Sequence, residues 1–208
     1  MVSKAQGRMK RALDFGLALC ALSAFAIPIS LIAVLIRLTS PGPVLYWSRR
    51  IGKDNHVFWM AKFRTMRTGT PQLATHLLKD SQNWITPLGR ILRVTSLDEV
   101  PQLLNIILGN MSFVGPRPAL FNQDDLIAQR TAYGVHEILP GLTGWAQING
   151  RDELEIGDKV AFDEYYLKHQ SLLFDVQILA LTFVKVLRRD GIKQAGEALK
   201  QSPTKQAA

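Results

Sequence analysis

The stretch FGLALCALSAFAIPISLIAVLI, residues 15–36, contains 22 consecutive residues without a charged side chain. A straight helix of this length would reach ~33 Å, which is enough to cross the ~30 Å hydrocarbon core of a membrane. A signal peptide is disfavoured because the run is long and Ile36-Arg37-Leu38 is not a small-residue cleavage site. A buried core helix is disfavoured because soluble helices seldom lack a polar face. The stretch therefore predicts a membrane segment.

Two features of this segment argue against a simple crossing. Pro28 removes a helix hydrogen bond near the middle and leaves arms that are each too short to cross alone. Basic residues flank both ends, as cytoplasmic flanks do: Lys4, Arg8, Lys10 and Arg11 before it, and Arg37, Arg49 and Arg50 after it. We therefore favour a re-entrant helix–break–helix hairpin over residues 1–38, with a kinked crossing as the alternative.

The distribution of charge also indicates a membrane surface. The net charge of the chain is +8, and residues 1–67 hold eleven bases and two acids, so the other two thirds sum to −1. The isoelectric point of about 9.8 permits a nucleic-acid binder. The bases lie beside the apolar run, however, which favours anionic phospholipid headgroups as partners and no nucleic acid. A single cysteine and four dispersed histidines exclude a disulfide framework and a local metal-ligand pair.

The remaining chain predicts a compact, mostly helical catalytic domain over residues 39–190 and a polar C-terminal tail over 191–208. Short strand patterns at 44–47 and 56–66 supply a small β element, and the helical spacing of apolar residues after Ser171 predicts an amphipathic, interfacial helix. The fold class is therefore α+β. On the second strand Lys62 and Arg64 share a face. Paired cations suit a diphosphate, but by themselves an exposed polar face is the better explanation.

Two further segments carry candidate chemistry. Asp98 and Glu99 are predicted at a helix N-terminus, where the helix dipole favours their ionised forms. The spacing from Ser96 to Glu99 also matches a capping box, which would give Glu99 a structural role. Arg117 lies between two prolines, and such a pre-set guanidinium suits phosphate, although by itself the segment is better explained as a plain rigid loop. Neither a dinucleotide fingerprint nor a P-loop is present.

Taken in chain order, these segments resemble the bacterial sugar transferase family, the small monotopic phosphoglycosyl transferases. The resemblance covers about residues 8–192. Its matching segments are KRALDFGLAL, SPGPVLYWSRRIG, KFRTMR, SLDEVPQLLNIILGNMSFVGPRP, PGLTGWAQINGR, FDEYYLKHQS and FDVQILALTFVKVLRRDG.

The resemblance implies Mg²⁺-dependent transfer of a sugar 1-phosphate from a UDP-sugar to undecaprenyl phosphate, with release of UMP, at the cytoplasmic face of the bacterial plasma membrane. It would be the first membrane step of exopolysaccharide, lipopolysaccharide or other glycoconjugate synthesis. By similarity, Asp98 is the nucleophile that takes the phosphosugar covalently, and the Asp98–Glu99 pair, chiefly Glu99, binds Mg²⁺. The residues that the resemblance assigns to substrate are Lys62, Arg64 and Arg117 on the diphosphate, Arg151 on phosphate or sugar, and Asp163 in a structural or substrate-orienting role.

Two rival functions stay open at this point. A non-enzymatic membrane-surface adaptor explains the charge asymmetry but not the carboxylate pair beside the proline-locked arginine. A conventional glycosyltransferase would release UDP instead of UMP. The donor sugar, the pathway and the oligomeric state, a homodimer included, are left open by the sequence.

Overall fold

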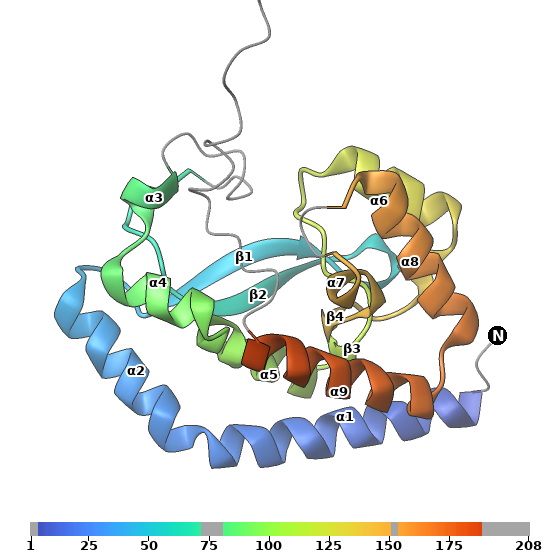
Figure 1. Cartoon of the computed structure of the whole chain (residues 1–208), viewed down its shortest axis with the longest axis horizontal. Helices are drawn as coiled ribbons and strands as arrows, with labels where there is room; N and C mark the ends of the chain where they lie inside the picture. The colour runs from blue at the N-terminus through green and yellow to red at the C-terminus, as the bar shows by residue number, and fades with distance from the viewer. Residues whose placement is uncertain (1–3, 72–80, 151–153, 189–208) are drawn as a thin grey trace, which may run out of the picture.

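The computed structural model describes residues 4–71, 81–150 and 154–188. The predicted tail at 191–208 lies outside these ranges, and the predicted domain boundaries stay predictions. The described elements are mostly helical with two small sheets, so the α+β prediction is confirmed (Figure 1).

The chain begins with two helices that meet at a sharp bend. Helix α1 spans Lys4–Ala24 and α2 spans Ala26–Thr39, with an angle of 61° between them. No single described helix is long and apolar enough to cross a membrane, whereas the bent pair together meets that test. The helix–break–helix prediction is confirmed, and the pair is consistent with a re-entrant hairpin.

The break falls at Phe25, three residues before the proline that the sequence suggested. Pro28 is the third residue of α2, and the first turn of a helix tolerates proline because its N–H has no intrahelical partner there. The proline therefore lies inside the second arm, and the predicted position of the break was wrong.

The small β element is an antiparallel hairpin of β1 (Leu45–Ile51) and β2 (Val57–Phe63). Its register places Tyr46 opposite Lys62 and Ser48 opposite Met60. A second sheet pairs β3 (Ser112–Val114) with β4 (Gly141–Thr143) in parallel.

The other described helices surround these sheets. They are α3 (Ser81–Trp84), α4 (Pro87–Val94), η3 (Leu97–Gln102), α5 (Leu103–Ile107), α6 (Asp124–Ala132), η4 (Val135–Glu137), α7 (Trp145–Ile148), α8 (Ile156–His169) and α9 (Leu172–Arg188), and the β-hairpin turn holds η1 (Lys53–Asn55).

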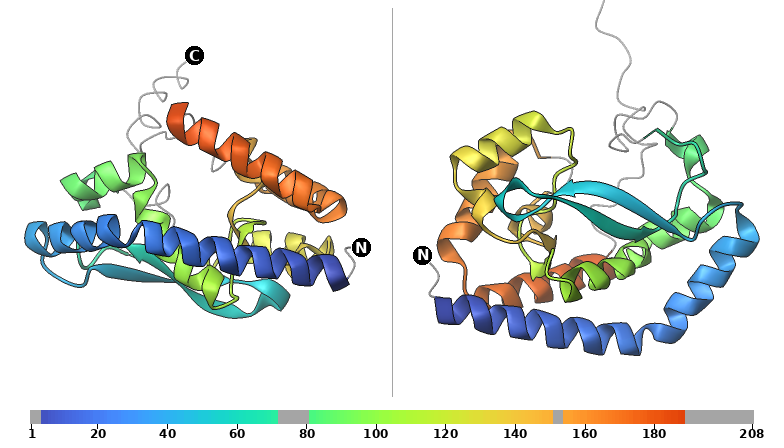
Figure 2. Two further views of the ribbon diagram at one scale, coloured as in Figure 1. Left: turned by 90° about the horizontal axis from the view of Figure 1, so that it is seen from below. Right: turned by 180° about the vertical axis from the view of Figure 1, so that it is seen from behind.

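The bent helix pair is part of the core and does not stand apart from the catalytic domain. Ala18 of α1 packs with Phe58 and Met60 of β2 and with Ile106 of α5. Ile32 and Ile36 of α2 pack against Phe63 at the end of β2 and Leu92 of α4. Figure 2 shows α1 and α2 along one edge, with the hairpin on one side of α1 and α9 on the other. The bent helix pair therefore packs directly against strand β2 and helices α4 and α5.

The outward faces of these helices are apolar. The large exposed hydrophobic side chains of α1 and α2 are Met9, Leu13, Phe15, Leu17, Leu19, Ile27, Leu31, Val34, Leu35 and Leu38. Helix α9 buries Asp175 and Ile178 on one face and exposes Leu173, Val176 and Phe183 on another. Large contiguous apolar surfaces mark interaction sites. The exposed apolar side chains of these helices are of the kind that contacts lipid.

Candidate functional site

Asp98 and Glu99 lie in the first turn of η3, which leads directly into α5. The predicted capping box is wrong, because Ser96 adopts a left-handed conformation and its side chain makes no cap hydrogen bond. Pro101 explains the local structure: the chain passes through a 3₁₀ turn around it, and the α-helix begins only at Leu103. The Glu99 side chain is therefore not part of a capping box, and its contacts are with other segments of the chain.

Three segments that are far apart in sequence meet at Glu99. Its Oε1 atom lies 2.7 Å from Nζ of Lys62 on β2 and 3.3 Å from Nη2 of Arg117, in the loop after β3. Lys62 and Glu99 are largely buried, whereas the Arg117 side chain is 36% exposed. The structure therefore brings four of the predicted residues together: Asp98, Glu99, Lys62 and Arg117.

The electrostatics of Asp98 are set by burial and by its cationic neighbours. Burial raises the pKa of the Asp98 carboxyl, the charge of Lys62 opposes this rise most strongly, and Glu99 adds to it. Arg93 and Arg117 also lower the pKa of Asp98. Burial likewise lowers the pKa of the Lys62 ammonium, and Glu99 is the main effect that raises it. With all five groups ionised, the two carboxylates and the three cations carry a net positive charge. This charge would attract an anionic ligand.

Arg93 was not singled out from the sequence. It lies in the last turn of α4, five residues before Asp98, and its Nε donates to Oγ1 of Thr65 at 2.8 Å. Arg50 was also missed: it donates to the Pro118 carbonyl at 3.1 Å and fixes the proline-rich loop from the hairpin side. Neither arginine belongs to a motif with a characteristic spacing, so only the fold shows that the two lie near the site.

The backbone of Arg117 is held by a buried ion pair. Arg130 of α6 donates from Nη1 to the Arg117 carbonyl at 2.7 Å and from Nη2 to Oδ2 of Asp163 at 2.6 Å. Asp163 on α8 is 1% exposed, and burial raises its pKa while Arg130 opposes this. Of the two roles predicted for Asp163, this contact supports the structural one.

Asp163→Asn is expected to destabilise the fold by about 3–5 kcal/mol, since it leaves the Arg130 guanidinium buried without its counter-charge. The matched change on the same helix is Lys168→Ala, which removes an exposed ion pair with Glu164 and is expected to cost less than about 0.5 kcal/mol. Chemical denaturation of both variants checks the difference. Equal losses would contradict the assigned role of Asp163.

Arg64 and Arg151 do not join this group among the described residues. Strand β2 ends at Phe63, and the Arg64 side chain turns to the α2–β1 junction, where Nη2 donates to the Ser40 carbonyl at 2.7 Å. Arg64 is 6% exposed, and burial together with the charge of Arg37 lowers its pKa. Its observed contact is therefore at the C-terminal end of α2. Arg151 lies outside the described residues.

The site fits a magnesium ion only in combination with substrate. Within the described ranges, no group of three or more His, Cys, Asp or Glu side chains could hold a metal. Mg²⁺ is commonly bound by one or two carboxylates together with substrate phosphates and water. Asp98 and Glu99, with Lys62 and Arg117 beside them, would supply the carboxylate part of such a donor set.

The fold thus joins a bent, apolar helix pair to a domain that presents a carboxylate pair among cations. Residues 5–189 match the family model described as bacterial sugar transferase, so the chain belongs to that family and the resemblance is confirmed.

The curated relatives include both short and long proteins. The chain is 39% identical over 186 residues to "Uncharacterized sugar transferase EpsL" of Bacillus subtilis strain 168, which covers 89% of this chain and 91% of that protein. It is 38% identical over 184 residues to UDP-glucose:undecaprenyl-phosphate glucose-1-phosphate transferase of Escherichia coli K12, covering 85% of this chain and 40% of that protein. A third relative is the UDP-N-acetylgalactosamine-undecaprenyl-phosphate N-acetylgalactosaminephosphotransferase of Aeromonas hydrophila, 34% identical over 190 residues, with 89% and 45% covered. The chain spans less than half the length of these last two.

Proposed function

We propose that the protein is a membrane phosphoglycosyl transferase that moves a sugar 1-phosphate from a UDP-sugar to undecaprenyl phosphate and releases UMP. The observation that carries the proposal is the half-buried Asp98 carboxylate beside Glu99, Lys62 and Arg117, on a domain built onto a bent apolar helix pair. The names of two relatives describe the same class of reaction.

The proposed reaction has two displacements at one phosphorus atom. An Asp98 carboxylate oxygen attacks the phosphorus bonded to the sugar oxygen, the bond to the bridging diphosphate oxygen breaks, and UMP leaves with its electron pair. A phosphate oxygen of undecaprenyl phosphate then attacks the resulting acyl phosphate. The Asp98 carboxylate is regenerated, and the sugar is carried on a lipid diphosphate. A covalent intermediate divides one difficult transfer into two easier ones.

The surrounding residues would stabilise the charge that moves in each step. Lys62 and Arg117 contact Glu99, and the charge of Arg93 acts on Asp98. A diphosphate bound beside the carboxylate pair would therefore lie near all three cations. Preorganised cations of this kind stabilise developing negative charge without reorganisation. Glu99 and Asp98 would hold Mg²⁺ with phosphate oxygens, and the ion would supply further charge neutralisation.

The membrane location follows from the acceptor. The lipid tail stays in the bilayer and its phosphate at the surface, so the site must lie at that boundary. Basic residues near an anionic surface contribute about 1 kcal/mol each. We assign the site to the cytoplasmic face of the bacterial plasma membrane, because basic residues flank both ends of the apolar run.

A nucleotide assay separates this function from its rivals. Purified protein with Mg²⁺, undecaprenyl phosphate and a panel of UDP-sugars is expected to release UMP with at least one donor, and less when Mg²⁺ is chelated. Release of UDP would instead support a conventional glycosyltransferase. Membrane binding with no nucleotide released from any donor would support the adaptor.

A further inference from the structure

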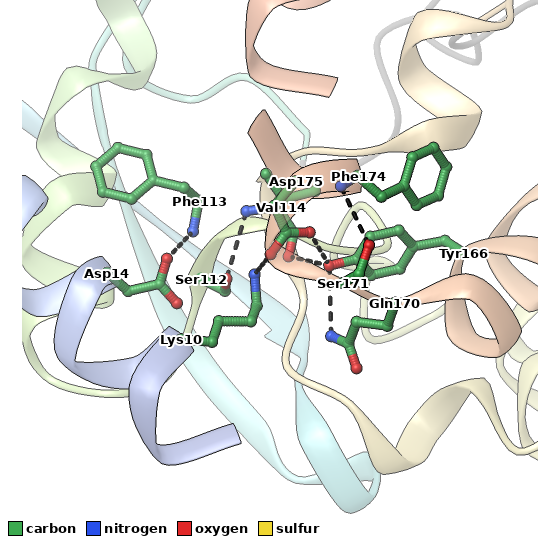
Figure 3. Close-up of polar contacts among 10 residues, drawn as sticks. All are labelled: Lys10, Asp14, Ser112, Phe113, Val114, Tyr166, Gln170, Ser171, Phe174 and Asp175. Atoms are coloured by element: carbon green, nitrogen blue, oxygen red, sulfur yellow. Dashed lines mark hydrogen bonds and ion pairs between the residues drawn. The ribbon is translucent and has the colours of Figure 1, made fainter. Parts of the chain in front are cut away.

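The polar turns of α1 that precede the apolar run face into the protein. Lys10 and Asp14 both point from α1 toward the catalytic domain in Figure 3. Lys10 Nζ lies 2.6 Å from Oδ2 of Asp175 on α9, and Asp14 is 5% exposed. Basic residues whose only role is to keep a membrane segment oriented would face water or lipid headgroups. The inward contacts of these side chains therefore indicate a second role.

Asp14 holds the strand that leads to Arg117. Its Oδ1 accepts the backbone N–H of Phe113, in the middle of β3, at 3.2 Å. Only Val114, Gly115 and Pro116 separate Phe113 from Arg117. The segment around the two prolines has little backbone freedom, so a displacement of β3 is carried to the Arg117 guanidinium.

Arg11 holds the helix that follows the carboxylate pair. Its guanidinium donates to the carbonyls of Ile106 at 2.5 Å and Ile107 at 2.8 Å, at the C-terminal end of α5. A cation at the C-terminal end of a helix interacts favourably with its last carbonyls and with the helix dipole. Because η3 runs into α5 without an intervening loop, the position of α5 determines where Asp98 and Glu99 lie.

The opposite side of β3 is held by a second contact that returns to α1. Tyr166 on α8, 1% exposed, directs its hydroxyl to the Val114 carbonyl at 3.1 Å and to Oδ1 of Asp175 at 2.7 Å. Burial and the Asp175 charge raise the pKa of Tyr166, so the phenol stays protonated and donates. Asp175 in turn pairs with Lys10, so α1 reaches β3 by two routes.

We propose that Arg11 and Asp14 are positioning residues for sugar 1-phosphate transfer: docking of the membrane helix through these two side chains places the Asp98–Glu99 turn and the Arg117 loop relative to each other. The inference rests on the proposed function and extends it, since it makes the membrane segment part of the assembly of the site.

The test is a comparison of Asp14→Ala with Asp14→Asn in undecaprenyl phosphate-containing vesicles. Alanine removes the acceptor for the Phe113 N–H, and kcat is expected to fall about 10- to 100-fold, the scale of a small misplacement of reacting groups. The KM for the UDP-sugar is expected to change less than about threefold. Asparagine keeps an oxygen acceptor and is expected to restore kcat to within about threefold. Asp125→Ala, at an exposed position in the first turn of α6, is the matched control.

Hydrogen exchange supplies a readout that does not depend on activity. Asp14→Ala is expected to speed amide exchange in peptides covering 112–118, and Arg11→Ala in peptides covering 97–107, with vesicle binding unchanged. Wild-type kcat and wild-type exchange in both variants would overturn the proposal. The proposal would also be overturned if activity fell only in proportion to the amount of folded or vesicle-bound protein. If the unmutated protein transferred no sugar phosphate, the proposed function would fail, while the exchange data would still decide whether α1 positions these segments.

Discussion

Asp98→Asn is expected to abolish UMP release, with turnover at least about 10⁴-fold below that of the unmutated protein, the scale of removing the nucleophile of a covalent mechanism. Asparagine matches the aspartate side chain in size but lacks the negative charge needed to attack phosphorus. Steady-state UMP release with the best UDP-sugar donor measures the effect.

The substitution is expected to leave the fold intact. Burial raises the pKa of Asp98, so ionised Asp98 carries a desolvation cost that asparagine does not have. Glu99 remains as the ion-pair partner of Lys62 and Arg117. The melting temperature and vesicle binding should therefore match the unmutated protein, and substantial turnover by this variant would remove Asp98 from the mechanism.

Gly115→Ala is expected to have the second large effect, this time through the backbone that carries Arg117. A Cβ atom at Gly115 would lie 2.4 Å from the Leu139 carbonyl oxygen and 2.9 Å from the Gly141 nitrogen. Both neighbours are backbone atoms beside or within β4, so the methyl group can be accommodated only if β3 and β4 separate. Overpacking of this kind typically costs about 1–3 kcal/mol, and we expect kcat to fall at least about 10²-fold because Arg117 moves.

Gly157→Ala is the control for that experiment. No atom lies within 4 Å of a Cβ at Gly157, and alanine is favoured over glycine in a helix. This variant should be as stable as the unmutated protein, or slightly more so, and fully active. If Gly115→Ala behaved in the same way, the close approach of β3 and β4 would not position the site.

The sequence was sufficient to predict the bent helix pair and to select the residues of the candidate site, and the reasons are local. An uncharged run of 22 residues with a proline near its middle indicates two apolar helical arms. Asp98, Glu99 and Arg117 stood out because carboxylates near a helix start and an arginine between prolines have local geometric consequences. Lys62 stood out only through strand alternation.

The features that the sequence analysis placed wrongly or did not find also have physical explanations. The break was placed at Pro28 because proline disrupts a helix interior, yet the second helix starts early enough for that residue to fall in its first turn. The parallel pairing of β3 with β4 joins segments about 30 residues apart and left no periodic signal. Arg64 seemed to share the face of Lys62, but alternation ends with the strand at Phe63. The inward contacts of Lys10 and Arg11 were missed because the sequence analysis assigned both residues to the basic flank of the apolar run, and Asp14 was not singled out.

The covalent step is tested most directly by intact-protein mass spectrometry after incubation with the UDP-sugar donor and Mg²⁺ but without undecaprenyl phosphate. The account predicts a species heavier by one sugar phosphate, which maps to the peptide containing Asp98, is absent from Asp98→Asn and disappears when undecaprenyl phosphate is added. An unchanged mass in a preparation that turns over with the lipid present, with UMP formed only together with the lipid product, would show direct transfer and contradict it.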